Sequence, residues 1–207
     1  MVDSRFHKVF YINLDRRPDR RAHIEHQLEQ MGFDSYERFP AIDRPGQGIV
    51  GCGYSHLAVL KLARERNYPN VLIFEDDFTF VVSPEQFSET ITAFFESPVG
   101  QDYDVCMLGY NLRDYDLCPD TPFMTRVRYA QTASGYLVHS RYYDALIELY
   151  EHAIPLLEKT GQHWVYANDV VWKSLQAKDR WFCFTQRFGR QIDGFSDNAN
   201  CYMKYDC

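Results

Sequence analysis

Three consecutive carboxylates after a short apolar run are the residues of this chain best suited to chemistry. Residues 71–74 are all apolar, and Glu75, Asp76 and Asp77 follow them directly. A short apolar run with polar boundaries is typical of a buried strand in a parallel α/β sheet. Open α/β sheets bind ligands beyond the carboxyl ends of their strands, which is where this triplet would lie.

The charge of the triplet indicates what it would bind. Adjacent like charges repel, so a site that keeps three carboxylates ionised requires a compensating cation. A divalent metal, held by carboxylate oxygens and by the phosphates of a substrate, would provide one. The alternative is a solvated acidic turn at the start of a loop.

Composition places the chain among globular proteins and argues against a nucleic-acid surface. The 207 residues fit one domain, 1–207, and 45% of them are hydrophobic, enough for a substantial core. Net charge is −7, whereas nucleic-acid-binding domains are usually basic. No segment reaches the roughly 18 apolar residues of a membrane span, so we expect no transmembrane segment.

Cysteine usage and the polar N-terminus favour an intracellular chain. The six cysteines include no C-x-x-C pair, so no zinc site is expected. Cys106 and Cys183 lie in apolar runs and are expected to be buried. Cys201 and Cys207 could pair, but free thiols are the expectation. Without a signal-peptide pattern, we expect a cytoplasmic protein of bacterial or viral type, with peripheral membrane association as an option.

The elements that would position the triplet alternate between strand and helix in the first half of the chain. Strands are predicted at residues 9–14, 36–42, 71–74, 105–108, 125–131, 135–138 and 181–185, with 125–131 and 135–138 as a pair. Helices are predicted at 18–31, 55–66, 84–96 with Ser83 as its cap, 141–159 broken at Pro155, and 167–177. A glycine-containing loop before residue 55, a long loop at 110–122 and an irregular tail from 189 complete the prediction. The pattern predicts a largely parallel α/β sheet with an antiparallel addition.

Five segments in order carry sequence motifs, at residues 9–20, 51–56, 71–78, 133–138 and 191–197. No glycine-rich phosphate loop of either common type occurs among them or elsewhere, so a P-loop or dinucleotide-binding enzyme is not expected. In turn, the segments resemble an opening I-N-L-D-R-R-P-D-R stretch, a G-C-x-x-S-H, an L-E-D-D strand, a G-Y-x-[IV] strand and a terminal Q-x-x-G-x-S-D. Taken together they resemble glycosyltransferase family 25, which includes lipopolysaccharide and collagen galactosyltransferases.

This resemblance implies a GT-A-type, Rossmann-like mixed sheet flanked by helices. It also implies a UDP-sugar donor, a divalent metal (commonly Mn²⁺, otherwise Mg²⁺) and inversion at the anomeric carbon. The chain departs from the family after Tyr166, where a proline that usually precedes the acidic residue is missing. Asp169 matches that acidic residue, and the departure puts its role in doubt.

A mechanism follows from these assignments. Asp77, assisted by Glu75 or Asp76, would hold the metal that bridges the donor phosphates. Asp169 is the candidate base that takes the proton of the acceptor hydroxyl. The alternative for Asp169 is a carboxylate that interacts only with a helix N-terminus.

The remaining candidate residues would contact the donor. Asn13, Arg16 and Arg20 follow the first strand, although arginines there could also form the solvated face of the first helix. Ser55 alone is most simply a helix N-cap, but with the resemblance Ser55 and His56 are expected to line the donor site. His56 is expected to form hydrogen bonds rather than to bind metal.

The tail would fold over the donor with Gln191, Ser196 and Asp197. Four aromatic residues could stack on sugars, although core packing is expected for each: Tyr110, Tyr115, Tyr136 and Trp164.

The leading hypothesis is a metal-dependent, inverting hexosyltransferase that moves galactose or glucose from a UDP-sugar to a glycan or to a hydroxylated protein. A second hypothesis is a degenerate domain that binds the UDP-sugar without transfer. A third, a metal-dependent phosphohydrolase, rests only on clustered carboxylates, and the D-x-D-x-[TV] arrangement of one large class is absent. The acceptor, the choice between galactose and glucose, and the oligomeric state stay open.

Overall fold

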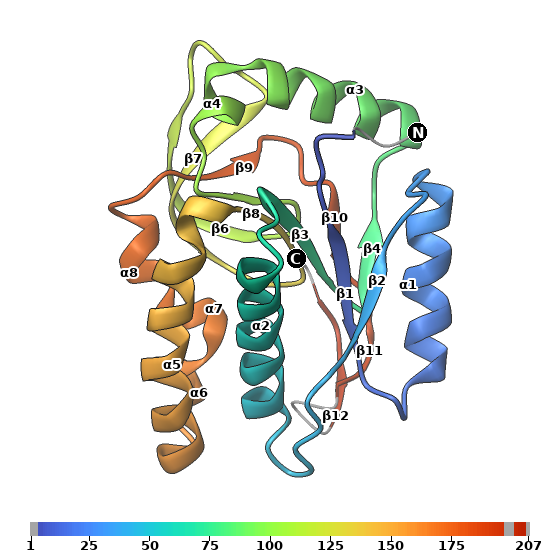
Figure 1. The fold of residues 1–207 in the computed structure, drawn as a ribbon, viewed down its shortest axis with the longest axis vertical. Helices are drawn as coiled ribbons and strands as arrows, with labels where there is room; N and C mark the ends of the chain where they lie inside the picture. Colours follow the sequence, from blue (N-terminus) through green and yellow to red (C-terminus); the bar gives the residue numbers. More distant parts are fainter. Residues whose placement is uncertain (1–3, 197–200, 206–207) are drawn as a thin grey trace.

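The computed structural model describes residues 4–196 and 201–205, and an eight-stranded mixed sheet organises them (Figure 1). The strand order is β2-β1-β3-β8-β5-β9-β7-β6. Strands β2, β1 and β3 run parallel, β8 is antiparallel to both of its neighbours, and β5 and β9 are again parallel. The predicted mixed α/β sheet flanked by helices is therefore confirmed. The expectation of a largely parallel sheet is wrong, because four of its seven strand pairings are antiparallel.

The bounds of the strands are as follows: β1 Val9–Asn13, β2 Glu37–Pro40, β3 Asn70–Glu75, β4 Phe78–Phe80, β5 Val105–Met107, β6 Asn111–Leu117, β7 Met124–Gln131, β8 Gly135–His139, β9 Trp181–Phe184, β10 Gly189–Gln191, β11 Gly194–Ser196 and β12 Cys201–Met203. The helices are α1 Pro18–Gln30, α2 Gly48–Glu65, α3 Pro84–Glu96, α4 Pro98–Gln101, α5 Tyr143–Thr160, α6 His163–Tyr166, α7 Asn168–Val171 and α8 Lys173–Gln176, with a 3-10 turn at Ser140–Tyr142 before α5.

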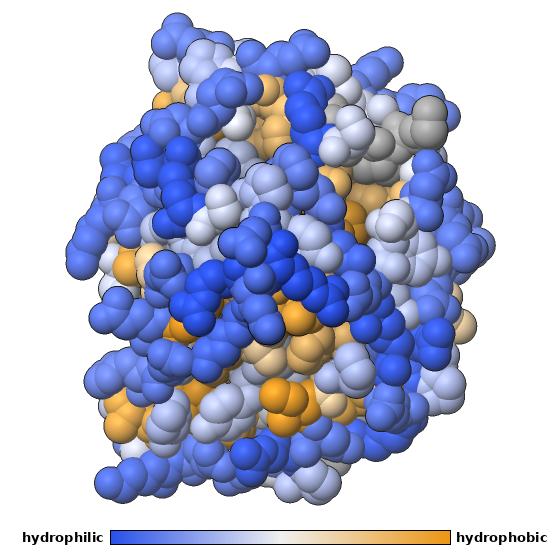
Figure 2. Space-filling view, viewed as in Figure 1, coloured by the Kyte–Doolittle hydropathy of each residue, from blue (hydrophilic) through white to orange (hydrophobic). Residues whose placement is uncertain are grey.

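Both faces of the sheet are buried, because alternate residues of its central strands enter two separate cores. Phe10 and Ile73 lie in the core beneath α2 and α5. Tyr11 and Phe74 lie in the core beneath α1 and α3. The near-continuous apolar sequence of β1 and β3 follows from this double burial. Hydrophilic side chains cover most of the face seen in Figure 2, where hydrophobic residues form separate patches.

Helix α2 begins seven residues before the predicted start at residue 55, so the expected glycine loop is wrong. Glycine there permits close packing rather than flexibility. A Cβ at Gly51 would lie 2.3 Å from the carbonyl oxygen of Ile42, and one at Gly53 would lie 3.1 Å from the side chain of Ile154 on α5. Ser55 is therefore inside the helix and is not its cap.

Several other predicted elements are corrected. The expected loop at 110–122 contains strand β6, whose side chains are largely exposed, so it shows no apolar alternation. Strands β7 and β8 do not pair with each other, because β8 inserts between β3 and β5 while β7 pairs with β6 and β9. Helix α5 continues through Pro155, where a break was expected. The single helix expected at 167–177 is split near Trp172 into α7 and α8. The tail, expected to be irregular, forms three short strands. Ser83 caps α3 as predicted, by accepting a hydrogen bond from the Gln86 backbone N–H.

No described helix is long and apolar enough to cross a membrane. Cys106 and Cys183 are buried as predicted, and the five cysteines of the described residues are free thiols. Cys207 lies outside the described residues, so its pairing with Cys201 stays untested.

Candidate active site

The acidic triplet forms a tight turn between β3 and β4 at the carboxyl edge of the parallel strands. Strand β10 pairs antiparallel with β4, and the Ile192 N–H donates to the Asp77 carbonyl oxygen over 2.9 Å. The ring of Phe78, the next residue, is packed against three glycines. A Cβ would lie 3.1 Å from this ring at Gly109, 2.6 Å at Gly135 and 2.0 Å at Gly189. The turn is thus fixed by backbone pairing on one side and by an enclosed aromatic ring on the other.

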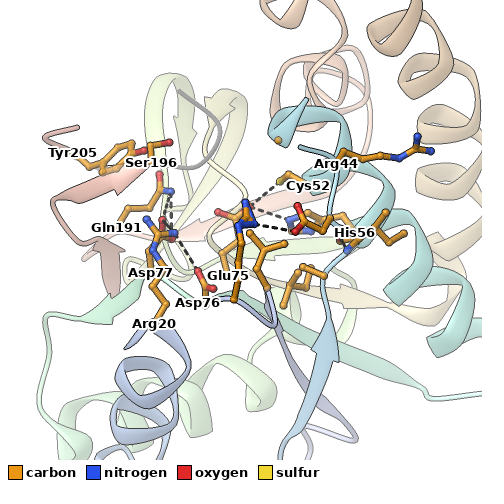
Figure 3. A pocket seen from close by; sticks show the side chains of 18 residues that line it. Arg20, Arg44, Cys52, His56, Glu75, Asp76, Asp77, Gln191, Ser196 and Tyr205 are labelled. Atoms are coloured by element: carbon orange, nitrogen blue, oxygen red, sulfur yellow. Dashed lines mark hydrogen bonds and ion pairs between the residues drawn. The ribbon is translucent and has the colours of Figure 1, made fainter. Parts of the chain in front are cut away.

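Asp76 and Asp77 converge on one cation, the guanidinium of Arg20. The Arg20 Nη1 donates to Asp76 Oδ1 over 3.2 Å and to Asp77 Oδ2 over 3.1 Å (Figure 3). The two carboxylates are only 7% and 4% exposed, so the ion pairs are largely shielded from water. Arg20 therefore lines the candidate pocket and does not belong to a solvated face, and its contact with a nucleotide stays a prediction.

Asn13 supports this cluster from beneath and does not line the pocket. Its amide Nδ2 donates to Asp76 Oδ2 over 2.7 Å and to the Arg17 carbonyl, and its Oδ1 accepts from Arg38 Nε over 2.9 Å. Every hydrogen-bonding atom of the buried amide is thus used by the protein. The structure makes Asn13 a residue that orients Asp76, not a direct ligand contact.

Burial opposes the ionisation of the Asp76 and Asp77 carboxyl groups. Burial, with the negative charges of Glu75 and Asp76, raises the pKa of Asp77 to about 7, and Arg20 offsets only part of the effect. Burial also raises the pKa of Asp76, against the opposing influence of Arg20 and Asn13. A carboxyl group with a pKa near neutrality at a strand end is typical of functional sites.

Glu75 lies on the other side of the turn and has different partners. Its Oε1 lies 3.0 Å from His56 Nε2 and accepts from the Cys52 thiol over 3.4 Å. The opposite ring nitrogen of His56, Nδ1, lies 2.8 Å from the Tyr136 hydroxyl. Burial alone would raise the pKa of Glu75, but His56, Cys52 and Arg20 together hold it below its usual value. The sequence predicted the hydrogen-bonding role of His56, and the structure supports it.

One open pocket is lined both by the Arg20–Asp76–Asp77 cluster and by the Cys52–His56–Glu75 group (Figure 3). Its walls come from the end of β1, the loop after β2, the first turns of α2, the acidic turn and the tail. The residues that the sequence predicted and that line it are Arg16, Arg20, Ser55, His56, Glu75, Asp76, Asp77, Gln191 and Ser196. Segments far apart in the sequence therefore do meet at one site.

Two of these lining residues have structural partners as well. Arg16 forms an ion pair with Asp43 across the pocket mouth at 3.1 Å. The Ser55 hydroxyl donates to the Gly51 carbonyl over 2.7 Å and accepts from the Ile42 N–H over 2.8 Å. Ser55 thus fastens the loop after β2 to α2, which is a positioning role inside the pocket wall.

The tail reaches the acidic turn, while its predicted position over a donor stays a prediction. The Gln191 amide donates to both Asp77 carboxylate oxygens, at 3.3 and 3.4 Å, and Ser196 is buried in the pocket wall. Asp197 lies outside the described residues. Sequence reasoning missed Asp43, Arg44, Cys52 and Tyr205 as pocket residues. Only Cys52 carried a signal, because it belongs to the quoted segment 51–56.

Asp169 lies near the Glu75 side of the site but is not among the residues that line the pocket. It is in the first turn of α7, and its Oδ2 accepts from the Thr132 N–H over 3.1 Å. Burial raises the pKa of Asp169, and the charge of Glu75 adds to the effect. Its neighbour Asn168 donates to Cys52 Sγ over 4.0 Å. The role of Asp169 as a base stays a prediction.

The four aromatic candidates divide into two classes. Tyr110 and Tyr136 are packed in the core, as expected. Tyr115 and Trp164 are 52% and 65% exposed, so the expected core packing is wrong for both. Tyr115 is on edge strand β6 and Trp164 is on the short helix α6, and neither element presents that side chain to the sheet.

Curated proteins named as members of glycosyltransferase family 25 are similar to this chain. One from Drosophila melanogaster is 30% identical over a match that covers 35% of this chain and 16% of that protein. One from Drosophila pseudoobscura pseudoobscura is 27% identical, covering 49% and 20%. A candidate glycosyltransferase of Acanthamoeba polyphaga mimivirus is 32% identical, covering 35% and 29%. These matches confirm the resemblance to family 25, while the chain spans less than a third of the length of each relative.

No family model matches the chain. Among solved structures, a glycosyltransferase involved in glycosylation of the major capsid of PBCV-1 superposes with a TM-score of 0.43 and 10% identity, covering 86% of this chain and 91% of that one. The galactosyltransferase LgtC, in complex with donor and acceptor sugar analogs, superposes with a TM-score of 0.46 and 13% identity, covering 84% and 72%. Likeness at this level supports no inference about activity.

Proposed function

We propose that this chain is a glycosyltransferase that moves a hexose from a UDP-sugar to a hydroxyl group of a glycan or of a hydroxylated protein. The observation that carries the proposal is the convergence of two buried carboxylates, Asp76 and Asp77, on one cation in an open pocket at the sheet's carboxyl edge. The confirmed resemblance to family 25 supports the same reaction class.

The donor diphosphate would bind beside the acidic turn with a divalent cation, Mn²⁺ or Mg²⁺. The donor set fits such an ion, because carboxylate oxygens are hard ligands and the Arg20 guanidinium already lies where Asp76 and Asp77 oxygens converge. Asp77 and Asp76 would hold the metal, whereas Glu75, the other ligand predicted from the sequence, faces His56 and Cys52 instead. When bound, the metal supplies positive charge to the departing UDP.

Arg20 has the second charged role in this proposal. With a divalent cation on the two carboxylates, the Arg20 guanidinium would contact a phosphate, for which its planar fork is suited. Arg16 lines the same pocket and would add a further positive charge. Gln191, Ser196 and Asp197 would close the tail over the donor, and Asn13 would keep Asp76 oriented beneath it.

Inversion requires a base on the side of the sugar opposite UDP. Asp169 would take the acceptor's proton, since burial raises its pKa and so makes the carboxylate a stronger base. In this arrangement the acceptor approaches from the α7 side, next to Glu75 and Cys52. The proposed donor sugar is galactose or glucose, and the acceptor is defined only as a hydroxyl-bearing glycan or protein.

The test is UDP release from UDP-galactose and UDP-glucose at pH 8 with Mn²⁺, with oligosaccharide and hydroxylysine-containing acceptors. We expect acceptor-dependent UDP release by the natural chain and at least a hundred-fold loss in Asp77→Asn. Asp144→Asn changes an exposed carboxylate that pairs with Arg64 and serves as the matched control. Full activity of Asp77→Asn would contradict the assignment of the metal site.

A second candidate function is binding of a UDP-sugar without transfer. The observation in its favour is that Arg20 pairs with both carboxylates, so positive charge is present beside the pocket without a metal ion. This candidate predicts UDP binding that is unchanged by a chelator, with no UDP release from any donor. Measurable transfer to an acceptor would exclude it.

A further inference from the structure

Three side chains of the described residues bring their metal-ligating atoms together on the far side of the turn from Asp77. These atoms, Cys52 Sγ, His56 Nε2 and a Glu75 carboxylate oxygen, all lie within 4.8 Å of one another. Cys52 and His56 are one turn apart on α2, which places both side chains on one face of the helix. Glu75 comes from the end of β3 and completes the group.

We propose that Cys52, His56 and Glu75 bind a borderline-soft divalent ion of the Zn²⁺ class, at a site separate from the Asp76–Asp77 pair. Thiolate and imidazole ligands select Zn²⁺ over Mn²⁺ or Mg²⁺, which prefer oxygen. Three protein ligands with one position left open are the arrangement of reactive zinc sites. Here all three ligands line the pocket, so the open position faces bound substrate.

The distances are close to those that a tetrahedral ion requires. Zinc bonds of about 2.0–2.3 Å place tetrahedral ligands about 3.3–3.6 Å apart. The Glu75 oxygen lies 3.0 Å from the His56 nitrogen and 3.4 Å from the Cys52 sulfur. These two pairs need to separate by only a few tenths of an ångström, and the Cys52 sulfur and the His56 nitrogen lie within 4.8 Å of each other.

The surrounding residues supply the support that metal ligands need. The Tyr136 hydroxyl, 2.8 Å from His56 Nδ1, can either donate or accept a hydrogen bond. In the metal-free site, a neutral His56 with its proton on Nε2 would donate to Glu75 and would accept from the Tyr136 hydroxyl at Nδ1. With metal, Nε2 is a ligand and Nδ1–H donates to Tyr136, so the imidazole keeps one proton. Asn168 donates to the Cys52 sulfur and would stabilise its thiolate.

Binding is balanced by the loss of one proton. Glu75 binds as the carboxylate, neutral His56 shifts its proton from Nε2 to Nδ1, and the Cys52 thiol releases its proton to solvent. No redox step is involved. A search for C-x-x-C pairs could not find this site, because its two helical ligands have the spacing C-x-x-x-H and the third is distant in sequence.

The experiment is a titration of the chelator-treated protein with Co²⁺, which reports thiolate ligation through a near-ultraviolet charge-transfer band. We expect one equivalent to bind, Zn²⁺ to displace it, and one proton to be released per ion. Cys52→Ala and Cys52→Ser should lose the band, and Tyr136→Phe should lower the affinity about ten-fold or more. Near-ultraviolet circular dichroism of each variant verifies that it is folded.

Two controls separate this site from the rest of the chain. Cys118→Ala should retain the band, because Cys118 lies outside the pocket. Asp77→Asn should retain it as well, whatever its effect on UDP binding, so failure of this inference is distinguishable from failure of the proposed function. Absence of a thiolate band in the natural chain, or its persistence in Cys52→Ala, would overturn the inference.

Discussion

Arg20 is the side chain that allows two adjacent buried carboxylates to coexist. Asp76 and Asp77 would otherwise repel each other in a poorly solvated site. The Arg20 guanidinium donates to one carboxylate oxygen of Asp76 and to one of Asp77. The Asn13 amide also donates to Asp76, and the Gln191 amide also donates to Asp77. Compensation is incomplete, since burial still raises the pKa of Asp77 to about 7. The negative charge of Asp76 and Asp77 that Arg20 leaves uncompensated would favour the binding of a divalent cation to these two carboxylates.

Asp77 should make the metal-free protein less stable as pH rises from about 4 to about 7. The pKa of Asp77 is about 7 in the folded chain and 3.8 as a model value, so the folded state retains a proton that the unfolded state has lost. The unfolding free energy therefore falls across this window and is flat above it. Asp77→Asn removes the effect, and we expect it to be more stable than the natural chain at pH 8 by a few kcal/mol.

Urea unfolding at pH 4 and pH 8 in the presence of a chelator measures this difference. The increase in unfolding free energy caused by Asp77→Asn should appear at pH 8 and nearly vanish at pH 4. The control Asp144→Asn should show no such difference between the two pH values. An Asp77→Asn variant that is destabilised at pH 8 would mean that the ionised carboxylate is fully compensated.

At the scale of elements, the acidic turn is held in place by glycines that admit the Phe78 ring. Gly109, Gly135 and Gly189 come from three different segments, and none has room for a methyl group beside this ring. The close packing explains why β10, β8 and the segment after β5 meet behind Asp77. The orientation of the carboxylates therefore depends on residues that never touch a ligand.

Gly189→Ala should destabilise the protein by about 1–3 kcal/mol, because the new Cβ would lie 2.0 Å from Phe78. Phe78→Leu in the same chain should recover part of the loss, which a double-mutant cycle of urea unfolding measures. Gly194→Ala is the control, since no atom lies within 4 Å of its added Cβ. Equal costs for the two alanine variants would show that the ring does not enforce the turn.

Elements were predictable from the sequence where burial imposes a pattern. The apolar runs of β1, β3 and β5 are buried on both faces, and Ser83 followed by Pro84 marks the start of α3. The start of α2 was not predictable, because glycines at 51 and 53 indicate flexibility unless the partners Ile42 and Ile154 are known. Strand β6 was missed because an exposed edge strand has no apolar face.

At the scale of the whole molecule, the mixed sheet gathers five sequence segments at one edge. The resemblance predicted nine of the lining residues, although it could not predict that Glu75 and Asp77 face different partners. The Asp77 and Glu75 side chains leave the same turn in different directions. Asp77 contacts Arg20 of α1, and Glu75 contacts His56 of α2. Two groups with different chemistry thus share one pocket.

The central claim is that this pocket binds a nucleoside diphosphate together with a divalent cation held by Asp77. The most direct test is thermal unfolding of the natural chain, Asp77→Asn and Asp144→Asn at pH 8, with UDP, with Mn²⁺, and with both. Ligand at a hundred times its Kd stabilises a protein by about 2.7 kcal/mol, which is readily detected. We predict a shift that requires both UDP and Mn²⁺ and is lost only in Asp77→Asn. A natural chain that does not respond to UDP, or an equal response in Asp77→Asn, would contradict the claim.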